Sequence, residues 1–172
     1  MQNKHIDDLG KLNIGCEVYV VSNNKVLLLK RSDTAKNFPG FWIGPGGHVD
    51  DGEDVLTAAI REVNEETGVL IDEQSIKLKV LSFHHHIDKN QVWIEYLFRA
   101  TINKVIETSD TNEGITKWFD VSEVANLKNI FPPTEHYFNH ILPETSGILY
   151  EFSRWNNSEL VEIVSRKIDT SL

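Results

Sequence analysis

The sequence predicts an α+β fold in which helices flank a mixed β-sheet. Two observations predict it: β-rich runs occur in hairpin-like pairs, and segments with helical start or stop signals lie between those pairs. With 172 residues, 40% of them hydrophobic and 25% charged, the chain has the composition of a soluble globular protein with one buried core. We therefore expect residues 1–172 to form a single domain.

The first pair of strands is expected at residues 14–21 and 25–31. Both runs are β-rich, and the tripeptide Ser22-Asn23-Asn24 between them is a hairpin signal. The segment NFPGFWIGPGG follows, and its Pro and Gly residues break any regular element. We therefore expect a loop there.

A helix is expected from Asp54 to about Thr67. Asp54 is a preferred N-cap residue, and Gly68 can adopt the left-handed conformation that ends many helices. Apolar residues recur within this helix at spacings of four and three, and they predict its buried stripe: Leu56, Ile60 and Val63.

The middle of the chain predicts a long hairpin with strands at residues 76–87 and 91–102, joined by Asp88-Lys89-Asn90. Side chains alternate between the two faces of a strand, so Glu95 should share a face with Trp93. The C-terminal third predicts, in order, a short strand ITKWFD, a helix from about Ser122, a helix after Pro132-Pro133, and a hairpin that turns at Asn156-Asn157.

Charge and composition limit the partners of the chain. Lys and Arg number 17 against 26 Asp and Glu, a formal charge of −9, and such a field repels a nucleic-acid polymer. The polar start MQNKHIDDLGKLN lacks the apolar core of a signal peptide, and no apolar run is long enough to cross a membrane. Cys16 is the only cysteine, which excludes an intrachain disulfide and a cysteine-based zinc site. We therefore expect a cytoplasmic protein, a monomer or a homodimer, that binds small molecules.

Three acids crowd one face of the expected helix. Residues three and four apart are neighbours on a helix, so Glu62 and Glu66 are adjacent, with Glu65 beside them. A divalent cation would turn their repulsion into attraction, and Mg²⁺ accepts a few carboxylates while filling its remaining positions with water and phosphate oxygens. The crowding therefore predicts a magnesium site for a phosphorylated ligand, whereas a bare acidic helix could also be a solvated surface.

The spacing around these acids resembles that of a known family. Fixed residues follow the pattern G-x5-E-x7-R-E-U-x-E-E-x-G-U, where U is apolar, and every position is met: Gly47, Glu53, Arg61, Glu62, Val63, Glu65, Glu66, Gly68 and Val69. This pattern over residues 47–69 resembles the Nudix box. The resemblance implies an α/β/α sandwich in which the box forms loop, helix and loop, and an enzyme that cuts a pyrophosphate bond in nucleoside diphosphate derivatives.

The resemblance also implies roles for single residues. The expected metal ligands are Glu62, Glu65 and Glu66, with Glu53 in support, and Mg²⁺ is the expected ion, with Mn²⁺ as a substitute. Arg61 is expected to pair with a box glutamate rather than with substrate. Gly46 and Gly47 are expected at the substrate, where Gly47 lets the backbone pass close to the metal.

The general base, which removes a proton from the attacking water, could be a glutamate of the box or an acid later in the chain. Family members differ in this respect, and Glu113 resembles the loop acid of MutT-type members, so it is a candidate metal ligand and base. Glu95 is the rival. We expect a structural or solvated role for His84, His85 and His86. Arg31, at the end of a strand beside the Gly-rich loop, is a candidate phosphate contact.

The C-terminal half resembles the 8-oxo-dGTP hydrolases of the MutT and oxidised-purine type. Phe131 corresponds there to an aromatic that stacks on the purine, although plain core packing would also explain it. Three positions depart from that type: Ile43, Pro133 and Thr134 stand where polar residues read the base. The sequence therefore predicts the reaction class without the polar residues that would select 8-oxoguanine.

Three functions remain open from the sequence. The first is Mg²⁺-dependent cleavage of a nucleoside triphosphate, such as an oxidised purine nucleotide, to the monophosphate and pyrophosphate. The second is hydrolysis of another conjugate, such as ADP-ribose, a nucleotide sugar or a dinucleoside polyphosphate. The third is a regulatory nucleotide-binding module without turnover, which the intact acidic set argues against. Cleavage at an RNA 5′ end is also conceivable, but the net charge disfavours it.

Overall fold

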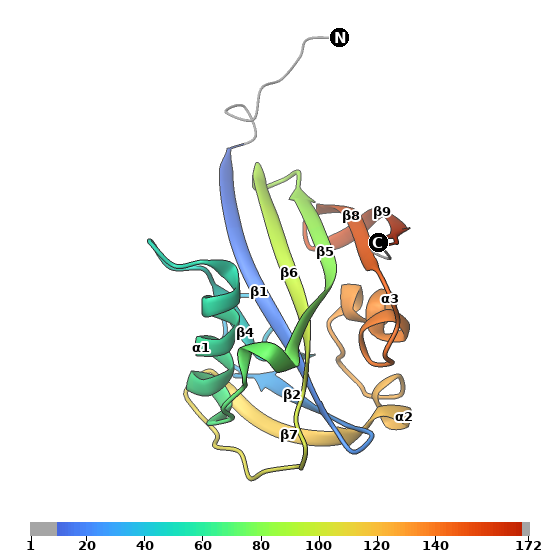
Figure 1. Cartoon of the computed structure of the whole chain (residues 1–172). Coiled ribbons are helices and arrows are strands. Elements are labelled where there is room, and N and C mark those ends of the chain that lie inside the picture. Colours follow the sequence, from blue (N-terminus) through green and yellow to red (C-terminus); the bar gives the residue numbers. More distant parts are fainter. Residues whose placement is uncertain (1–9, 170–172) are drawn as a thin grey trace.

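Helices cover both faces of one mixed β-sheet in this computed structural model, which describes residues 10–169 (Figure 1). The sheet has nine strands: β1 (Lys11–Ser22), β2 (Lys25–Arg31), β3 (Trp42–Ile43), β4 (Gly46–His48), β5 (Ile76–His86), β6 (Gln91–Thr101), β7 (Gly114–Asp120), β8 (Ile148–Asn156) and β9 (Glu159–Ile168). The helices are α1 (Val55–Thr67), α2 (Val121–Val124) and α3 (Pro132–Ile141), with the short 3-10 helix η2 (Glu73–Ser75). The α+β prediction is confirmed.

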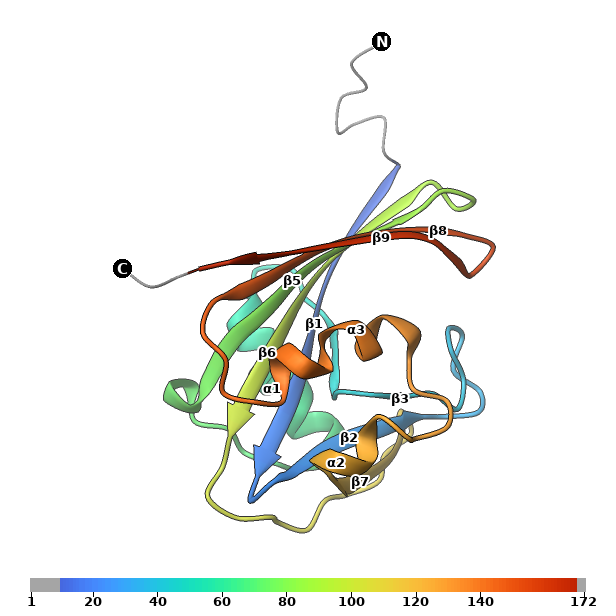
Figure 2. The same cartoon turned by 90° about the vertical axis from the view of Figure 1, so that its right-hand side faces the viewer.

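The strand order is β3-β2-β1-β6-β5-β8-β9, with β4 paired to β1 and β7 paired to β2. β1 runs parallel to β6 and β5 runs parallel to β8, whereas the hairpin pairs are antiparallel, so the sheet is mixed. The view in Figure 2 shows β9 at the outer edge of this sheet and α3 beneath its inner face.

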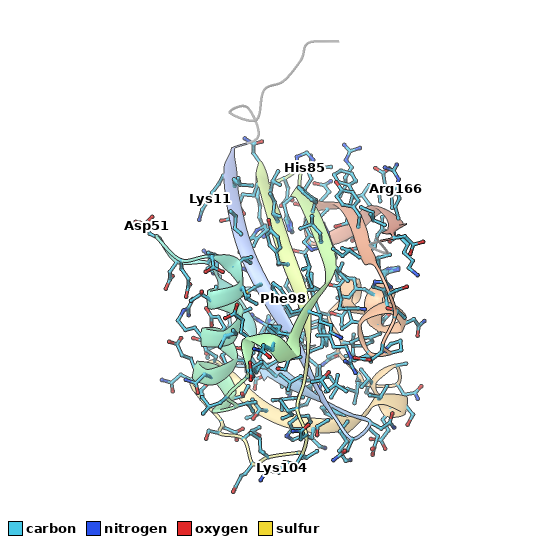
Figure 3. The ribbon with its side chains drawn as sticks, viewed as in Figure 1. Lys11, Asp51, His85, Phe98, Lys104 and Arg166 are labelled. Atoms are coloured by element: carbon cyan, nitrogen blue, oxygen red, sulfur yellow. The ribbon has the colours of Figure 1, made fainter. Side chains whose placement is uncertain are left out.

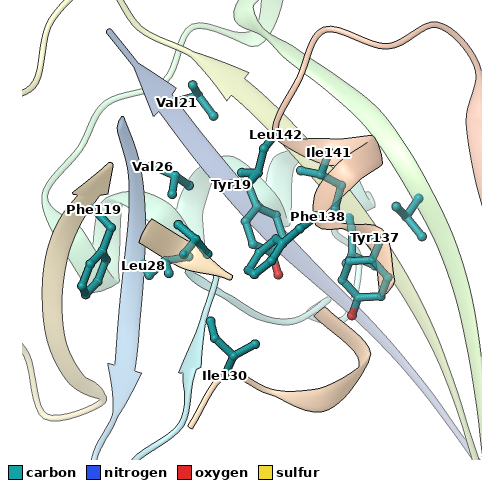
Figure 4. Close-up of a cluster of buried hydrophobic side chains, with 13 residues drawn as sticks. Tyr19, Val21, Val26, Leu28, Phe119, Ile130, Tyr137, Phe138, Ile141 and Leu142 are labelled. Carbon is teal, nitrogen blue, oxygen red and sulfur yellow. The ribbon is translucent and has the colours of Figure 1, made fainter. Parts of the chain in front are cut away.

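The two faces of the sheet carry two hydrophobic clusters. The cluster under α1 includes Val18, Leu27 and Ala59, and the cluster under α3 includes Tyr19 and Phe138. Figure 4 shows the second cluster, in which the ring of Tyr19 meets that of Phe138 edge-on at a centroid distance of 5.8 Å. Alternation along β1 supplies both clusters, because successive residues point to opposite faces.

Most of the expected elements are present, with local corrections. The loop after β2 contains β3 and β4, two short strands that the Gly- and Pro-rich sequence conceals. The last hairpin turns one residue later than expected, at Asn157 and Ser158, whose φ angles of 50° and 65° suit a two-residue turn. In α1 the expected stripe is shifted, since Leu56 and Ile60 are only partly buried while Ala58, Ala59 and Val63 are fully buried.

No helix within residues 10–169 is long and apolar enough to span a membrane. The start of the chain, for which we expect no signal peptide, lies largely outside the described residues.

Candidate active site

The helix that carries the acids is fixed at both ends by its own sequence. The Asp54 carboxylate accepts hydrogen bonds from the backbone N–H groups of Leu56 (2.9 Å) and Thr57 (3.1 Å). At the other end Gly68 has a φ of 73° and donates its N–H to Asn64 O, so the helix ends as predicted. These caps define where each turn lies and so bring the acidic side chains onto one face.

Arg61 is the centre of the acidic group. Its guanidinium holds both oxygens of Glu53, at 3.0 and 2.9 Å, and donates to Glu62 Oε1 at 2.9 Å and Glu65 Oε2 at 3.2 Å. It also donates to the carbonyl of His48. The hydrogen bonds from Arg61 hold the pKa of Glu53 below its ordinary value. Arg61 therefore contacts box glutamates, as the resemblance implied, rather than facing outward.

Glu66 is the most enclosed acid of the box. It is 6% exposed, and its Oε2 accepts a hydrogen bond of 2.8 Å from the backbone N–H of Gly46. Burial raises the pKa of Glu66 to about 8. A buried carboxylate with a single hydrogen bond is unfavourable as an anion unless a cation approaches it.

Two glycines allow this close packing. A Cβ on Gly47 would lie 2.6 Å from the carboxyl carbon of Glu62, and a Cβ on Gly46 would lie 2.7 Å from the Cα of Glu17. A side chain at residue 46 would collide with the backbone of β1, and one at residue 47 would displace the Glu62 carboxylate. The two glycines therefore let the backbone of β4 pack closely between β1 and the acids of α1.

The carboxylates fit a hard divalent cation in their chemistry. Arg61 or Gly46 binds one oxygen of Glu62, Glu65 and Glu66. Within residues 10–169 the other oxygens of these three acids, Glu62 Oε2, Glu65 Oε1 and Glu66 Oε1, make no hydrogen bond. In the described chain no three acids already converge at ligand distance. Oxygen donors from carboxylates are those that Mg²⁺ and Mn²⁺ prefer, so the donor set fits.

Arg31 and Glu113 are brought to the same place from other elements. Glu113 is exposed and precedes β7, and its carbonyl accepts a hydrogen bond of 2.8 Å from Ser32 N, next to Arg31. Both charges act on Glu66: the Glu113 carboxylate raises its pKa and the Arg31 guanidinium lowers it. Arg31 itself donates to Asn37 O at 2.9 Å. The structure therefore gathers both predicted residues around the box.

Glu95, the rival base, lies with the α3 face of the sheet. It is two residues before Leu97, which belongs to the cluster under α3, and it accepts or shares a hydrogen bond of 3.2 Å with His84 Nε2. The other ring nitrogen of His84 bonds Ser153 Oγ at 2.6 Å. His84 therefore has the structural role that the sequence favoured, and the position of Glu95 does not support it as the base beside α1.

A buried polar layer surrounds this pair and was missed from the sequence. Glu17 accepts hydrogen bonds from Tyr19 Oη (2.6 Å) and Gly44 N (2.5 Å), and Glu151 Oε1 accepts one from Ser82 Oγ (3.2 Å). Burial raises the pKa of Glu17 and that of Glu151 to about 7. The available signal was a single acid within each apolar run, in IGCEVYVV and ILYEFSRW. A strand pattern alone does not show that β1 and β8 face the same helix.

Glu151 gives a pH-dependent prediction. It is fully buried, its Oε2 has no hydrogen-bond partner within residues 10–169, and burial is the main cause of its raised pKa, with His84 opposing it. A raised carboxyl pKa means that the folded state holds the proton longer, so stability is lost as pH rises from 4.5 through about 7. At about 1.4 kcal/mol per pKa unit, the loss is at most roughly 3 kcal/mol.

We therefore expect Glu151→Gln to gain free energy of unfolding relative to the wild type as pH is raised from 5 to 8. Urea unfolding at both pH values measures this, and the exposed Glu159→Gln is the matched control. A difference between Glu151→Gln and wild type that is independent of pH would contradict the assignment.

Aromatic side chains gather at the N-terminus of α3. Phe131 is the N-cap residue, and its ring is stacked with that of Trp155 at a centroid distance of 6.4 Å and an interplanar angle of 6°. Phe38, which belongs to the Gly-rich loop, also contacts Phe131, and their ring centroids are 4.5 Å apart. The ring of Phe131 is partly exposed, so it is available to a ligand as well as to its neighbours.

Three residues connect the acids to this aromatic and polar side. Gly44 N donates to Glu17 on the α3 face, and Gly46 N donates to Glu66 of the box, with Pro45 between them. The segment therefore touches both regions, and a ligand lying along it could contact both.

Two surface hollows lie elsewhere. One of about 490 Å³ is lined by residues of α2 and α3 together with Arg99, and one of about 230 Å³ is lined by Lys77, Lys79 and Arg99 among others. Neither includes a residue of the box. The candidate site is therefore defined by its donor groups and not by a cavity.

Comparison with known proteins decides the family. A family model of the NUDIX domain matches residues 13–140, which is more than half of the chain. This chain belongs to the Nudix family. Nudix hydrolases act on pyrophosphate bonds, so the chain is an enzyme of that class, as the box pattern predicted.

The proteins that resemble this Nudix protein carry different names, and not all of these names describe a specific activity. It is 48% identical over 65 residues to an m7GpppN-mRNA hydrolase of Xenopus laevis, a match that covers 37% of this chain and only 22% of that protein. It is 27% identical over 151 residues to the uncharacterized Nudix hydrolase YvcI of Bacillus subtilis, covering 86% of this chain and 89% of that one. The crystal structure of a MutT protein from Bacillus halodurans superposes with a TM-score of 0.75 at 25% identity, covering 89% and 97% of the two chains. The fold is therefore the Nudix fold of MutT-like structures.

Proposed function

We propose that this Nudix protein is a pyrophosphohydrolase that uses Mg²⁺ to convert a nucleoside triphosphate into a nucleoside monophosphate and pyrophosphate. One observation carries the proposal. The Gly44–Pro45–Gly46 segment contacts a box acid on one side and the buried polar layer beside the aromatic rings on the other. Phosphates beside α1 and a base beside Phe131 fit that arrangement.

The region beside Phe131, where a nucleobase would lie, favours a nucleotide over a bare polyphosphate as substrate. A base that stacks on an aromatic ring gains roughly 1–3 kcal/mol, and the partly exposed ring of Phe131 offers such a surface, while the buried Trp155 packs beside it. The polar groups nearby are Glu17, His84 and Glu95 on the strands, together with Thr134, whose Oγ1 accepts a hydrogen bond of 3.5 Å from Tyr19 Oη. Base discrimination depends on such hydrogen bonds, so an oxidised purine belongs among the substrates tested.

The chain supplies the groups for hydrolysis. Glu62, Glu65 and Glu66 would hold the cation, with Glu53 and Arg61 orienting Glu62 and Glu65. A divalent ion bound there supplies charge neutralisation of the phosphates, polarisation of phosphorus and a lowered pKa for a bound water. Arg31 would bind phosphate. In the reaction water adds to one phosphorus, the bridging P–O bond breaks, and the proton of the water passes to a base of the chain.

We assign that base to Glu113, whose charge raises the pKa of Glu66. Replacing Glu113 with Gln should abolish activity or raise the pH that activity requires, because hydroxide must then replace the missing base. The pH dependence of kcat measures this, with Asp110→Asn in the same loop as the control. An unchanged profile would move the role to a box glutamate.

A substrate screen tests the proposed function. The purified protein is incubated with Mg²⁺ and nucleoside triphosphates, 8-oxo-dGTP, ADP-ribose, nucleotide sugars and dinucleoside polyphosphates, and the products are identified. We expect monophosphate and pyrophosphate from triphosphates as the fastest reaction. Faster cleavage of ADP-ribose or another conjugate would overturn the substrate class, and nucleotide binding without turnover on any compound would identify a regulatory module.

RNA 5′ ends are a second candidate, favoured by the similarity over 65 residues to an m7GpppN-mRNA hydrolase. The net charge of −9 opposes it, because a long polyanion is repelled. The same screen decides between them when it includes a capped and a 5′-triphosphorylated oligonucleotide beside the matching mononucleotide. We expect the mononucleotide to be cleaved faster.

A further inference from the structure

The outermost strand of the sheet, β9, has a free edge whose pattern fits a second copy of the same strand. We propose that two copies of the chain form a symmetric dimer by antiparallel pairing of β9 with β9, which joins their sheets into one. This inference is independent of the proposed function, since β9 contains no residue of the candidate site.

The edge of β9 is long and open. The strand has ten residues, and within residues 10–169 it pairs only with β8. Its apolar side chains stay exposed: Val161 by 61%, Val164 by 37% and Ile168 by 53%. An edge strand of this length with exposed apolar residues is a template for pairing unless it is protected, and β9 carries no proline. Figure 3 shows Arg166 of β9 at the outer margin of the molecule.

An apolar row crosses the sheet and stops at this edge. Strand register places five residues side by side, one each from β1, β6, β5, β8 and β9: Ile14, Ile94, Phe83, Phe152 and Val164. All five are partly or largely exposed, because α1 covers other positions of the same face. A two-fold axis through Val164 would continue this row directly into the row of the second copy. Register in sheets is set by such hydrophobic patterns.

The same two-fold axis at Val164 brings opposite charges of the two copies of β9 together. Antiparallel pairing about Val164 places Glu162 of each copy opposite Arg166 of the other, since both lie two residues from the axis on the same face. Arg166 has no ion-pair partner in the described chain, and Glu162 has only a long contact of 3.5 Å with Arg154. The strand is thus self-complementary, as an isologous interface requires.

Charge exchange tests the proposal with the full chain. The mass in solution is measured by sedimentation over a concentration series, and the wild type is expected at twice the chain mass of 19.7 kDa. Glu162→Arg and Arg166→Glu should each be monomeric, because like charges then face one another. An equal mixture of the two variants should regain the dimer mass, because each then presents the charge that the other lacks.

Two further variants complete the test. Val164→Lys should be monomeric, since it places two ammonium groups at the axis, whereas Glu123→Arg on α2 should stay dimeric as a matched surface change. A wild type that is monomeric at every concentration overturns the proposal. A dimer that persists in Val164→Lys, or charge variants that stay monomeric when mixed, overturns the β9 pairing. Rescue on mixing also shows that both variants are folded.

Discussion

Replacing Glu66 with Gln is expected to lower kcat by more than the roughly 10–100-fold that is typical of residues that only support a metal ligand. The carboxylate is enclosed and hydrogen-bonded by Gly46, and the charges of Glu62 and Glu113 raise its pKa further, so its ionised form is unfavourable unless a cation binds it. Steady-state kinetics across a Mg²⁺ series measures the loss. Glu135→Gln, an exposed acid of α3, is the control and should behave as wild type.

The same variant should fold at least as well as the wild type in the absence of metal. Burial raises the pKa of Glu66 to about 8, so its contribution to stability is present below pH 4.5 and is lost as pH rises through about 8. Gln removes that loss, and its amide oxygen can still accept from Gly46. Thermal unfolding at pH 8 should therefore give an equal or higher Tm. Near-wild-type turnover would remove Glu66 from the metal site.

Replacing Arg61 with Lys is expected to cost about 10–100-fold in activity or in metal affinity, although the charge is kept. Only a planar guanidinium can hold both oxygens of Glu53 while it also reaches Glu62 and Glu65. A lysine would satisfy one of these acids at a time, and the others would be free to turn away from the cation.

The Mg²⁺ concentration that gives the half-maximal rate shows whether Arg61 acts through the geometry of its guanidinium or through its charge alone. We expect it to rise in Arg61→Lys but to stay unchanged in Arg154→Lys, where the arginine is exposed on β8 and makes only a long contact. Full activity at the wild-type metal concentration would show that Arg61 contributes its charge alone.

The parts of the site that follow local rules were predictable from the sequence. Asp54 and Gly68 define the ends of α1 by capping, and once the helix is placed, the spacing of the box acids fixes their common face. Arg61 was expected to meet a glutamate, and the structure shows it meeting three.

The parts that depend on strand neighbours were not predictable. β4 is a three-residue strand of Gly-Gly-His that exists only because β1 pairs with it. Glu17 and Glu151 each look like an isolated acid in an apolar run, and only the sheet order brings both strands under α3. The error in the α1 stripe has a similar origin, because the helix packs closely through its alanines, Ala58 and Ala59, and leaves Leu56 and Ile60 at the margin.

Binding of Mn²⁺, followed by electron paramagnetic resonance with a non-hydrolysable nucleotide present, tests the metal site most directly. The acids of α1 should bind the ion, Mg²⁺ should compete for it, and Glu62→Gln together with Glu66→Gln should weaken binding by at least the roughly 10–100-fold seen for supporting residues. If the wild type binds no divalent ion, or if the double variant binds it equally well, the crowded carboxylates do not form a metal site and the proposed reaction loses its basis.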